Sequence, residues 1–153
     1  MGRGDRGETM PRARCSDQPL PEFVTALEQF NQGRFFEQHE TLEMLWRNEF
    51  GRLRGLYQGI LQVGVGFHHL KRGNYNGAVH LLERGLSRLA AYAPACQGVD
   101  VARLISETRR CYEQLLSLGA QHLDAFDWSL VPQVHWTSGT PPTTSTQPEH
   151  HIG

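Results

Sequence analysis

Apolar residues recur every three or four positions along most of this chain, and glycine or proline divides the pattern into five stretches. This spacing places the apolar side chains on one face of an α-helix. We expect helices over residues 22–31, 35–49 and 53–71, a fourth between Asn74 and Pro94, and a fifth between Asp100 and Gly119. No stretch alternates apolar and polar residues as a half-buried strand does. The sequence therefore predicts an all-α fold.

Short connections between these stretches make consecutive helices antiparallel neighbours. We expect a single small bundle of about five helices, built from two helical hairpins and a C-terminal helix, over residues 19–136. Residues 1–18 are rich in Gly and Arg, and residues 137–153 are rich in Thr, Ser and Pro, so both are expected to be disordered tails. The aromatic residues in 121–136 indicate that part of this segment packs back onto the bundle.

The stretch 53–71 is apolar over a wide surface, which is typical of a central helix with neighbours on more than one side. It contains Gly59, Gly64 and Gly66, and each glycine costs about 1 kcal/mol of helix propensity relative to alanine. Their presence indicates close helix contact or the close approach of a ligand, and we favour helix contact.

Charge and hydropathy argue against several classes of partner. The formal net charge is −1, so no global attraction to nucleic acid or anionic lipid is expected. The longest apolar stretch, 59–70, is short and contains polar residues, so a membrane span is not expected. The N-terminal segment lacks the apolar core of a secretory signal. We therefore expect a cytoplasmic protein without nucleic-acid or membrane partners.

The three cysteines, Cys15, Cys96 and Cys111, are odd in number and widely spaced. No CxxC pair occurs, which excludes a zinc ribbon or a thioredoxin-type motif. The pattern fits reduced thiols in the cytosol.

The segment 39–46 and the stretch 53–71 carry the polar residues most able to form a site. His39 and Glu43 are four residues apart and share a helix face, and His39 is expected on the core side. If the two helices pack as a hairpin, their polar groups can converge. The candidate cluster comprises His39, Glu40, Glu43, Trp46, Gln58, Gln62, His68 and His69.

Three interpretations of this cluster remain open. His39, Glu43 and His69 have side chains that bind divalent metals, although HExxE lacks the second histidine of the zincin motif. Alternatively, a Glu and a His perform acid–base catalysis, but no nucleophile or oxyanion hole can be named. The third interpretation, which we favour, is a buried hydrogen-bond network of His, Glu and Gln that fixes helix register.

Two motifs resemble those of domain-of-unknown-function family 309. One is Gly33-x-Phe35-Phe36-Glu37-x-His39-Glu40-x-Leu42-Glu43-x-x-Trp46, and the other runs from Leu56-Tyr57-Gln58-Gly59-Ile60-Leu61-Gln62-Val63 through His68-His69 to Gly73-Asn74-x-x-Gly77-Ala78. The resemblance covers about residues 22–120 and implies a small all-helical fold. It implies no activity and no catalytic residue. A departure is Gly64, with Gly66 close by, where the family tends to have alanine or another small residue.

These observations leave the biochemical function unassigned. The favoured hypothesis is a non-catalytic helical binding or scaffold domain, with another protein as its partner. The alternative is a metal-dependent or acid–base enzyme that uses His39, Glu43 and His69. The sequence does not indicate a cofactor beyond a divalent metal in that alternative, nor an oligomeric state.

Overall fold

The computed structural model describes residues 14–142, and within them the chain is an all-α bundle. Its α-helices are α2 (Pro21–Asn31), α3 (Phe35–Asn48), α4 (Leu53–Lys71), α5 (Tyr75–Leu89) and α6 (Val101–Leu118). Shorter 3₁₀ helices are η1 (Ala90–Tyr92), η2 (Ala120–Ala125) and η3 (Trp128–Leu130). The expected two hairpins and C-terminal helix are confirmed, and α2, α3, α4 and α5 are consecutive neighbours.

The helix boundaries follow local signals in the sequence. Pro21 is the first residue of α2, where its missing N–H is not needed. The side chain of Asn74 accepts a hydrogen bond from the Gly77 N–H, and that of Asp100 accepts one from the Arg103 N–H, so the two residues cap α5 and α6. The fourth helix ends five residues before Pro94, because the chain tightens into η1 after Leu89.

α4 is the central helix, and α5 packs against it most extensively. A Cβ atom on Gly59 would lie 2.8 Å from Leu89 Cδ2, and one on Gly66 would lie 2.8 Å from Leu82 Cδ2. The two glycines therefore let α5 approach α4 closely, which confirms that they serve helix contact.

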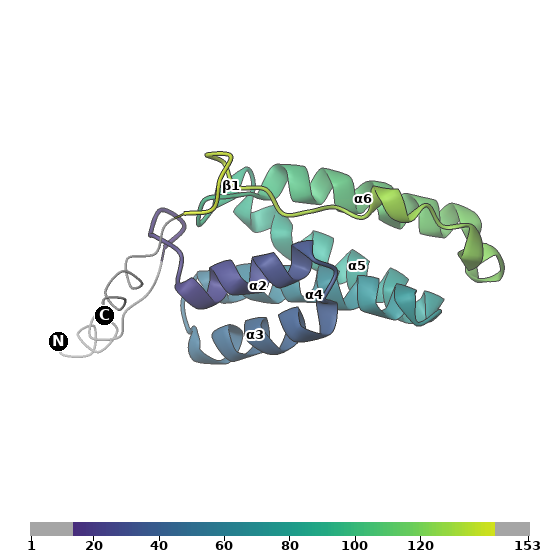
Figure 1. Ribbon diagram of the computed structural model, residues 1–153, viewed down its shortest axis with the longest axis horizontal. Coiled ribbons are helices and arrows are strands. Elements are labelled where there is room, and N and C mark those ends of the chain that lie inside the picture. Colours follow the sequence, from purple (N-terminus) through teal and green to yellow (C-terminus); the bar gives the residue numbers. More distant parts are fainter. Residues whose placement is uncertain (1–13, 143–153) are drawn as a thin grey trace.

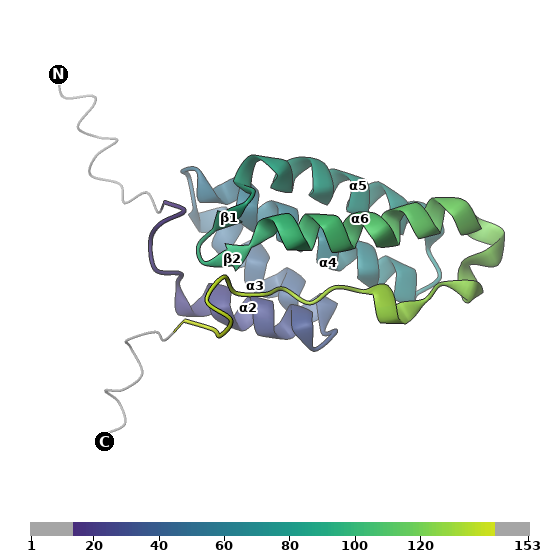
Figure 2. The same cartoon turned by 90° about the horizontal axis from the view of Figure 1, so that it is seen from above.

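The C-terminal segment packs back along the bundle between α2 and α6, as expected (Figures 1 and 2). The Asn31 side chain accepts a hydrogen bond from the Val134 N–H at 2.6 Å and donates one to the Val134 carbonyl at 3.1 Å. Farther along, the Thr137 N–H donates to the Gly98 carbonyl. These hydrogen bonds attach the segment to the end of α2 and to the turn at Gly98.

A small antiparallel pair of strands, β1 (Ala95–Cys96) and β2 (Val99–Asp100), connects η1 to α6. The sequence analysis missed it, because a two-residue strand is too short to show an alternating pattern. Gln97, at its turn, has a φ of 56°.

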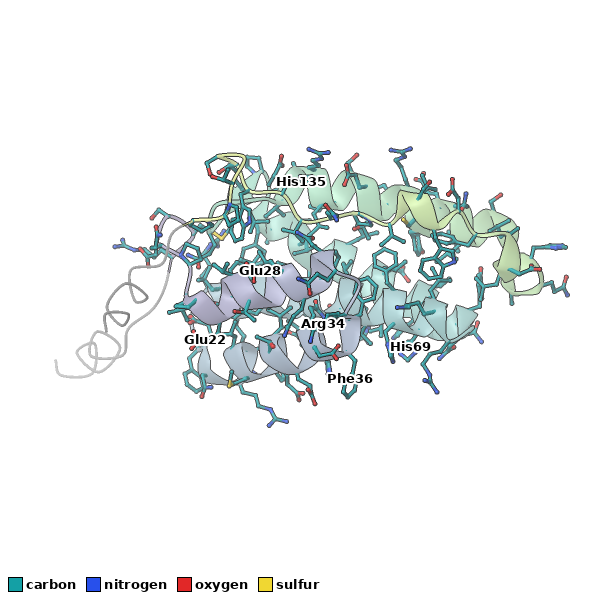
Figure 3. The ribbon with its side chains drawn as sticks, viewed as in Figure 1. Glu22, Glu28, Arg34, Phe36, His69 and His135 are labelled. Atoms are coloured by element: carbon teal, nitrogen blue, oxygen red, sulfur yellow. A yellow bond between two sulfur atoms is a disulfide. The ribbon has the colours of Figure 1, made fainter. Side chains whose placement is uncertain are left out.

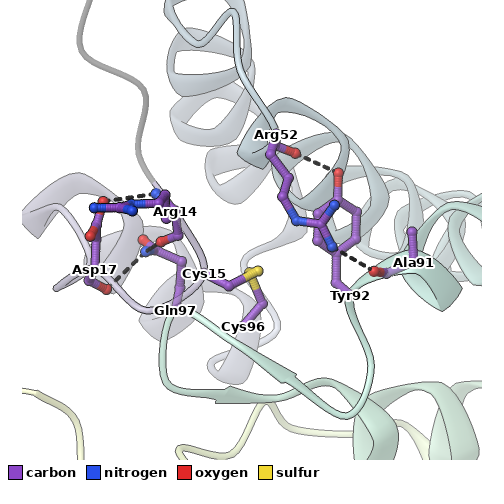
Figure 4. The surroundings of a disulfide bond; sticks show 8 residues. All are labelled: Arg14, Cys15, Asp17, Arg52, Ala91, Tyr92, Cys96 and Gln97. Atoms are coloured by element: carbon purple, nitrogen blue, oxygen red, sulfur yellow. Dashed lines mark hydrogen bonds between the residues drawn. A yellow bond between two sulfur atoms is a disulfide. The ribbon is translucent and has the colours of Figure 1, made fainter.

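The expected reduced state of the cysteines is wrong for two of them. Cys15 and Cys96 form a disulfide that joins the N-terminal turn to β1 (Figure 4). Gln97 Nε2 donates to the carbonyls of Arg14 and Asp17, and its backbone N–H donates to that of Cys15. Cys111 is free and buried, and burial raises its pKa to about 12.

Two short stretches of the expected tails, 14–18 and 137–142, lie among the described residues. Cys15 in the first is bonded to Cys96, and the Thr137 N–H in the second donates to the Gly98 carbonyl. The rest of the two expected tails, 1–13 and 143–153, lies outside the described residues. Within 14–142, no helix is both long and apolar enough to cross a lipid bilayer.

Candidate functional site

A pocket of about 210 Å³ opens where α3, α4 and α5 meet, and we call it the α4 pocket. Helix α3 contributes one side of it, α4 the floor and α5 a single leucine. Five members of the predicted cluster line it together with two leucines: His39, Glu43, Trp46, Gln58, Gln62, Leu61 and Leu81.

The α3 side of the pocket carries a pair of titratable side chains. His39 Nε2 lies 3.6 Å from Glu43 Oε1, and Arg47 donates a 2.9 Å hydrogen bond to Glu43 Oε2. Glu43 and Arg47, four residues apart on α3, therefore form an ion pair. About a third of each of the His39 and Glu43 side chains is exposed, at 35% and 33%. His39 is thus at the mouth of a groove and not on the core side.

The favoured interpretation of a buried network is not supported by this geometry. Gln62 is buried and accepts a long 3.4 Å hydrogen bond from Arg88, but its partner lies on α5, outside the predicted cluster. Gln58 has no hydrogen-bond partner among the described residues. The cluster consequently lines an open pocket whose polar groups keep unused hydrogen-bonding capacity.

Trp46 forms an apolar wall of the α4 pocket. The guanidinium carbon of Arg54 lies 4.7 Å from the centre of its ring, which is a cation–π contact. The Nε1–H of Trp46 is buried and finds no acceptor in the described part of the chain. A buried donor without a partner destabilises the fold by about 1–3 kcal/mol.

The remaining members of the cluster lie elsewhere. Glu40 is exposed on the outer side of α3. The His69 Nδ1 atom lies 3.2 Å from Asn74 Nδ2, at the turn between α4 and α5. His68 contacts the ring of Phe36, with 6.1 Å between ring centroids.

The metal and enzyme alternatives required His39, Glu43 and His69 to converge, and the structure separates them. Ring contacts lead from His39 to Phe36, from Phe36 to His68 and from His68 to His69, so two rings stand between the outer histidines. Over residues 14–142, no three His, Cys, Asp or Glu side chains are grouped closely enough to hold a metal ion. The expected convergence of these three side chains is therefore not seen among the described residues.

The pKa of His68 is lowered. Burial is the largest cause, and the nearby charges of Arg72, His69, Lys71 and His39 add to it. Each of these effects disfavours the protonated, positively charged form of the ring. His68 is therefore held toward its neutral form beside Phe36.

Several important residues were missed by the sequence analysis. Leu81 and Arg88 are on α5, seven residues apart and hence on one helix face, but only the crossing of α5 over α4 brings that face to the pocket. Arg54 is four residues before Gln58 on α4, a spacing that could have included it in the cluster. Gln38 is fully buried against α4 and occupies an unassigned position of the first motif.

Comparison with known proteins gives a family but no activity. Residues 23–81 match the family model described as "Domain of unknown function (DUF309)". The chain is similar to "Uncharacterized protein YpuF" of Bacillus subtilis (strain 168), with 31% identity over 102 residues, which are 64% of this chain and 59% of that protein. It is also similar to an "Uncharacterized protein" of Aquifex aeolicus (strain VF5), with 26% identity over 90 residues, 57% of this chain and 25% of that protein.

The chain thus spans less than two thirds of the length of either relative. No solved structure matches it significantly. The family match ends at residue 81, whereas the two motifs indicated a resemblance to about residue 120. It includes most of α2, all of α3 and α4, and thus the α3 and α4 sides of the pocket. The expected resemblance to domain-of-unknown-function family 309 is confirmed over residues 23–81, which match the model of that family.

Proposed function

We propose that this domain is a non-catalytic binding domain whose α4 pocket receives one apolar side chain from an acidic segment of a partner protein. The observation that supports this proposal most strongly is the combination of apolar walls, from Trp46, Leu61 and Leu81, with two arginines at the rim. Arg54 and Arg88 contact the lining residues Trp46 and Gln62, and neither has an acidic partner among residues 14–142.

The size of the pocket favours a polymer segment over a free metabolite. Pockets that enclose small molecules usually measure about 300–1,000 Å³, whereas the α4 pocket measures about 210 Å³ and is open to solvent. It has room for about one side chain. The remainder of a ligand would lie outside it, along the helices.

The charge at the rim favours an acidic segment. The Glu43 carboxylate already has a hydrogen bond from Arg47 and lies near His39. Arg54 contacts only the ring of Trp46, and Arg88 reaches only the Gln62 amide; neither is in an ion pair within the described residues. The uncompensated charge is therefore positive, and complementary charge guides partner choice and association.

The polar groups in the α4 pocket would determine the orientation of a bound segment. Gln58 has a free amide, and the Trp46 Nε1–H lacks an acceptor among the described residues. A backbone carbonyl of a bound segment could accept from the Gln58 amide, which lines the pocket. The apolar anchor would then give affinity, while this amide would fix the orientation of the segment.

The test is a titration of full-length protein labelled with ¹⁵N in its tryptophan side chains. The peptide acetyl-Asp-Leu-Asp-amide is compared with acetyl-Lys-Leu-Lys-amide and acetyl-Asp-Gly-Asp-amide, and the Trp46 signal is identified with Trp46→Phe. The first peptide should shift the Trp46 signal with a millimolar dissociation constant, while Trp128 and Trp136 stay unchanged. An equal response to all three peptides, or no response of Trp46, would contradict the proposal.

Other expectations about partners and location stay predictions. These are the absence of nucleic-acid and membrane partners and a place in the cytoplasm. The Cys15–Cys96 disulfide removes one support for the last of these, because disulfides persist mainly in oxidising compartments.

A further inference from the structure

The outward side of α3 exposes large apolar side chains. Phe36 is 54% exposed and Met44 is 50% exposed, and Phe50, two residues beyond the helix, is 65% exposed. Figure 3 shows Phe36 on the outer side of α3, where one side of its ring also contacts His68 of α4. Of the described large hydrophobic residues with comparable exposure, the other three are dispersed: Leu20, Leu116 and Trp128. Apolar exposure gathered on one helix is typical of an interaction surface.

Charged residues on this outward side are ordered along the helix. Glu40 lies in its first half and Arg47 in its second half, and both border the same shallow depression with Met44. The order Phe36, Glu40, Met44, Arg47, Phe50 nearly mirrors itself about the point between residues 43 and 44, with acid exchanged for base. We call these five residues the α3 face.

This arrangement is complementary to itself. If two copies of α3 lie antiparallel across a two-fold axis near Met44, Glu40 of each copy is opposite Arg47 of the other. The same register places Phe36 of each copy near Phe50 of the other. A two-fold interface requires such a match, because one surface must serve both sides.

We propose that two copies of this chain pair through their α3 faces, antiparallel and centred on Met44. Arg47 can take part without losing its present partner, because a guanidinium has five N–H donors and only one is used toward Glu43. Met44 at the centre is a flexible side chain that adapts to its own copy. The antiparallel order also sets opposite ends of the two helix dipoles side by side.

The surface is one helix long, so the interface is of the small class that forms reversible complexes. The dimer should therefore depend on protein concentration. The pairing is independent of the proposed peptide binding. Leu81 lines the α4 pocket, Arg54 and Arg88 contact its lining residues, and none of the three is part of the α3 face.

The test is sedimentation velocity of the full-length, disulfide-bonded protein over a range of concentrations. Wild-type protein should shift from monomer to dimer. Either Glu40→Arg or Arg47→Glu alone should raise the dimer dissociation constant roughly tenfold or more, because each homodimer then opposes two pairs of like charges. An equimolar mixture of the two variants should recover the wild-type dissociation constant, because every pair is then opposite in charge.

Phe36→Asp should also abolish the dimer, whereas Leu116→Asp, at an equally exposed leucine of α6, should not change it. Circular dichroism checks that each variant is folded. A wild-type protein that stays monomeric at millimolar concentration would overturn the proposal. The proposal would also be overturned if Leu116→Asp weakened the dimer as strongly as Phe36→Asp. It would equally be overturned if the mixture of Glu40→Arg and Arg47→Glu associated no better than either variant alone.

Discussion

The amide of Gln38 lies directly over Gly64, so that a Cβ atom on Gly64 would stand 2.5 Å from Gln38 Nε2. Gln38 is fully buried, and its Oε1 has no hydrogen-bond partner among the described residues. The contact joins α3 to α4 close to the pocket. It also gives a structural reason for glycine at a position where the resemblance indicates alanine or another small residue.

This contact predicts that Gly64→Ala changes the free energy of unfolding in opposite directions in the presence and in the absence of the Gln38 side chain. Gly64→Ala should destabilise the wild-type protein by about 1–3 kcal/mol, because the alanine methyl overlaps the Gln38 amide. In a Gln38→Ala background the same change should stabilise by about 1 kcal/mol, the difference in helix propensity. Urea unfolding measures both free energies. Gly66→Ala, which meets Leu82 on α5, is the control and should destabilise in both backgrounds.

Two buried tyrosines predict opposite effects of losing a hydroxyl group. The Tyr57 hydroxyl has no hydrogen-bond partner in residues 14–142, whereas the Tyr92 hydroxyl donates to the Arg52 carbonyl at 2.6 Å (Figure 4). Tyr57→Phe should therefore stabilise by about 1 kcal/mol, and Tyr92→Phe should destabilise by about 1 kcal/mol. Chemical unfolding distinguishes the two. Destabilisation by Tyr57→Phe would mean that its hydroxyl makes a favourable interaction.

Tyr57 also predicts a dependence on alkaline pH. Burial, followed by the charges of Glu49 and Glu22, raises its pKa to about 12, above the value of about 10 in the unfolded chain. The folded state therefore holds the proton more tightly, and stability falls as pH rises above about 10. Tyr57→Phe should reduce the loss of melting temperature between pH 9 and about 11. An equal loss in both proteins would contradict this assignment.

The lowered pKa of His68 predicts that the protein loses stability at acidic pH. Its pKa is lowered in the folded protein, so the unfolded chain binds the proton more readily. The resulting loss of stability is absent above the pKa of histidine in the unfolded chain, about 6.5, and it grows as the pH falls below that pKa. His68→Gln should lose less melting temperature than wild type between neutral pH and pH of about 5. The exposed His122→Gln is the control, and equal losses in all three proteins would contradict the account.

The Cys15–Cys96 disulfide closes a loop of 81 residues in sequence separation and should contribute about 2–4 kcal/mol to stability. Cys15→Ser/Cys96→Ser should lower the urea midpoint by the corresponding amount. A reducing agent should lower the midpoint of wild type to that of the variant and leave the variant unchanged. Identical midpoints for oxidised and reduced wild-type protein would contradict the stabilising role of the bond.

The helices could be predicted because their signals are local. Asn74 and Asp100 cap helices through hydrogen bonds to backbone groups three residues away, and those distances are fixed by helix geometry. The disulfide could not be predicted, because nothing near Cys15 or Cys96 shows that the two residues meet. A short strand pair between η1 and α6 likewise depends on the path of the chain and not on a periodic pattern.

The part of the candidate site that could be predicted also depends on local spacing along a helix. His39 and Glu43 share a face of α3 by spacing alone, and Gln58 and Gln62 do so on α4. His69 does not join them, because eleven residues of helix separate it from Gln58, a rise of about 16 Å. The positive rim was not foreseen, since Arg88 reaches Gln62 only through the packing of α5 on α4.

The most direct test of the proposed function is the dissociation constant of acetyl-Asp-Leu-Asp-amide for wild type and for Arg54→Gln/Arg88→Gln. The double variant should bind roughly tenfold more weakly and with less dependence on salt. Arg109→Gln/Arg110→Gln, on the exposed side of α6, changes net charge equally and should bind as wild type does. Equal affinity in the two double variants would contradict an acidic ligand at the α4 pocket.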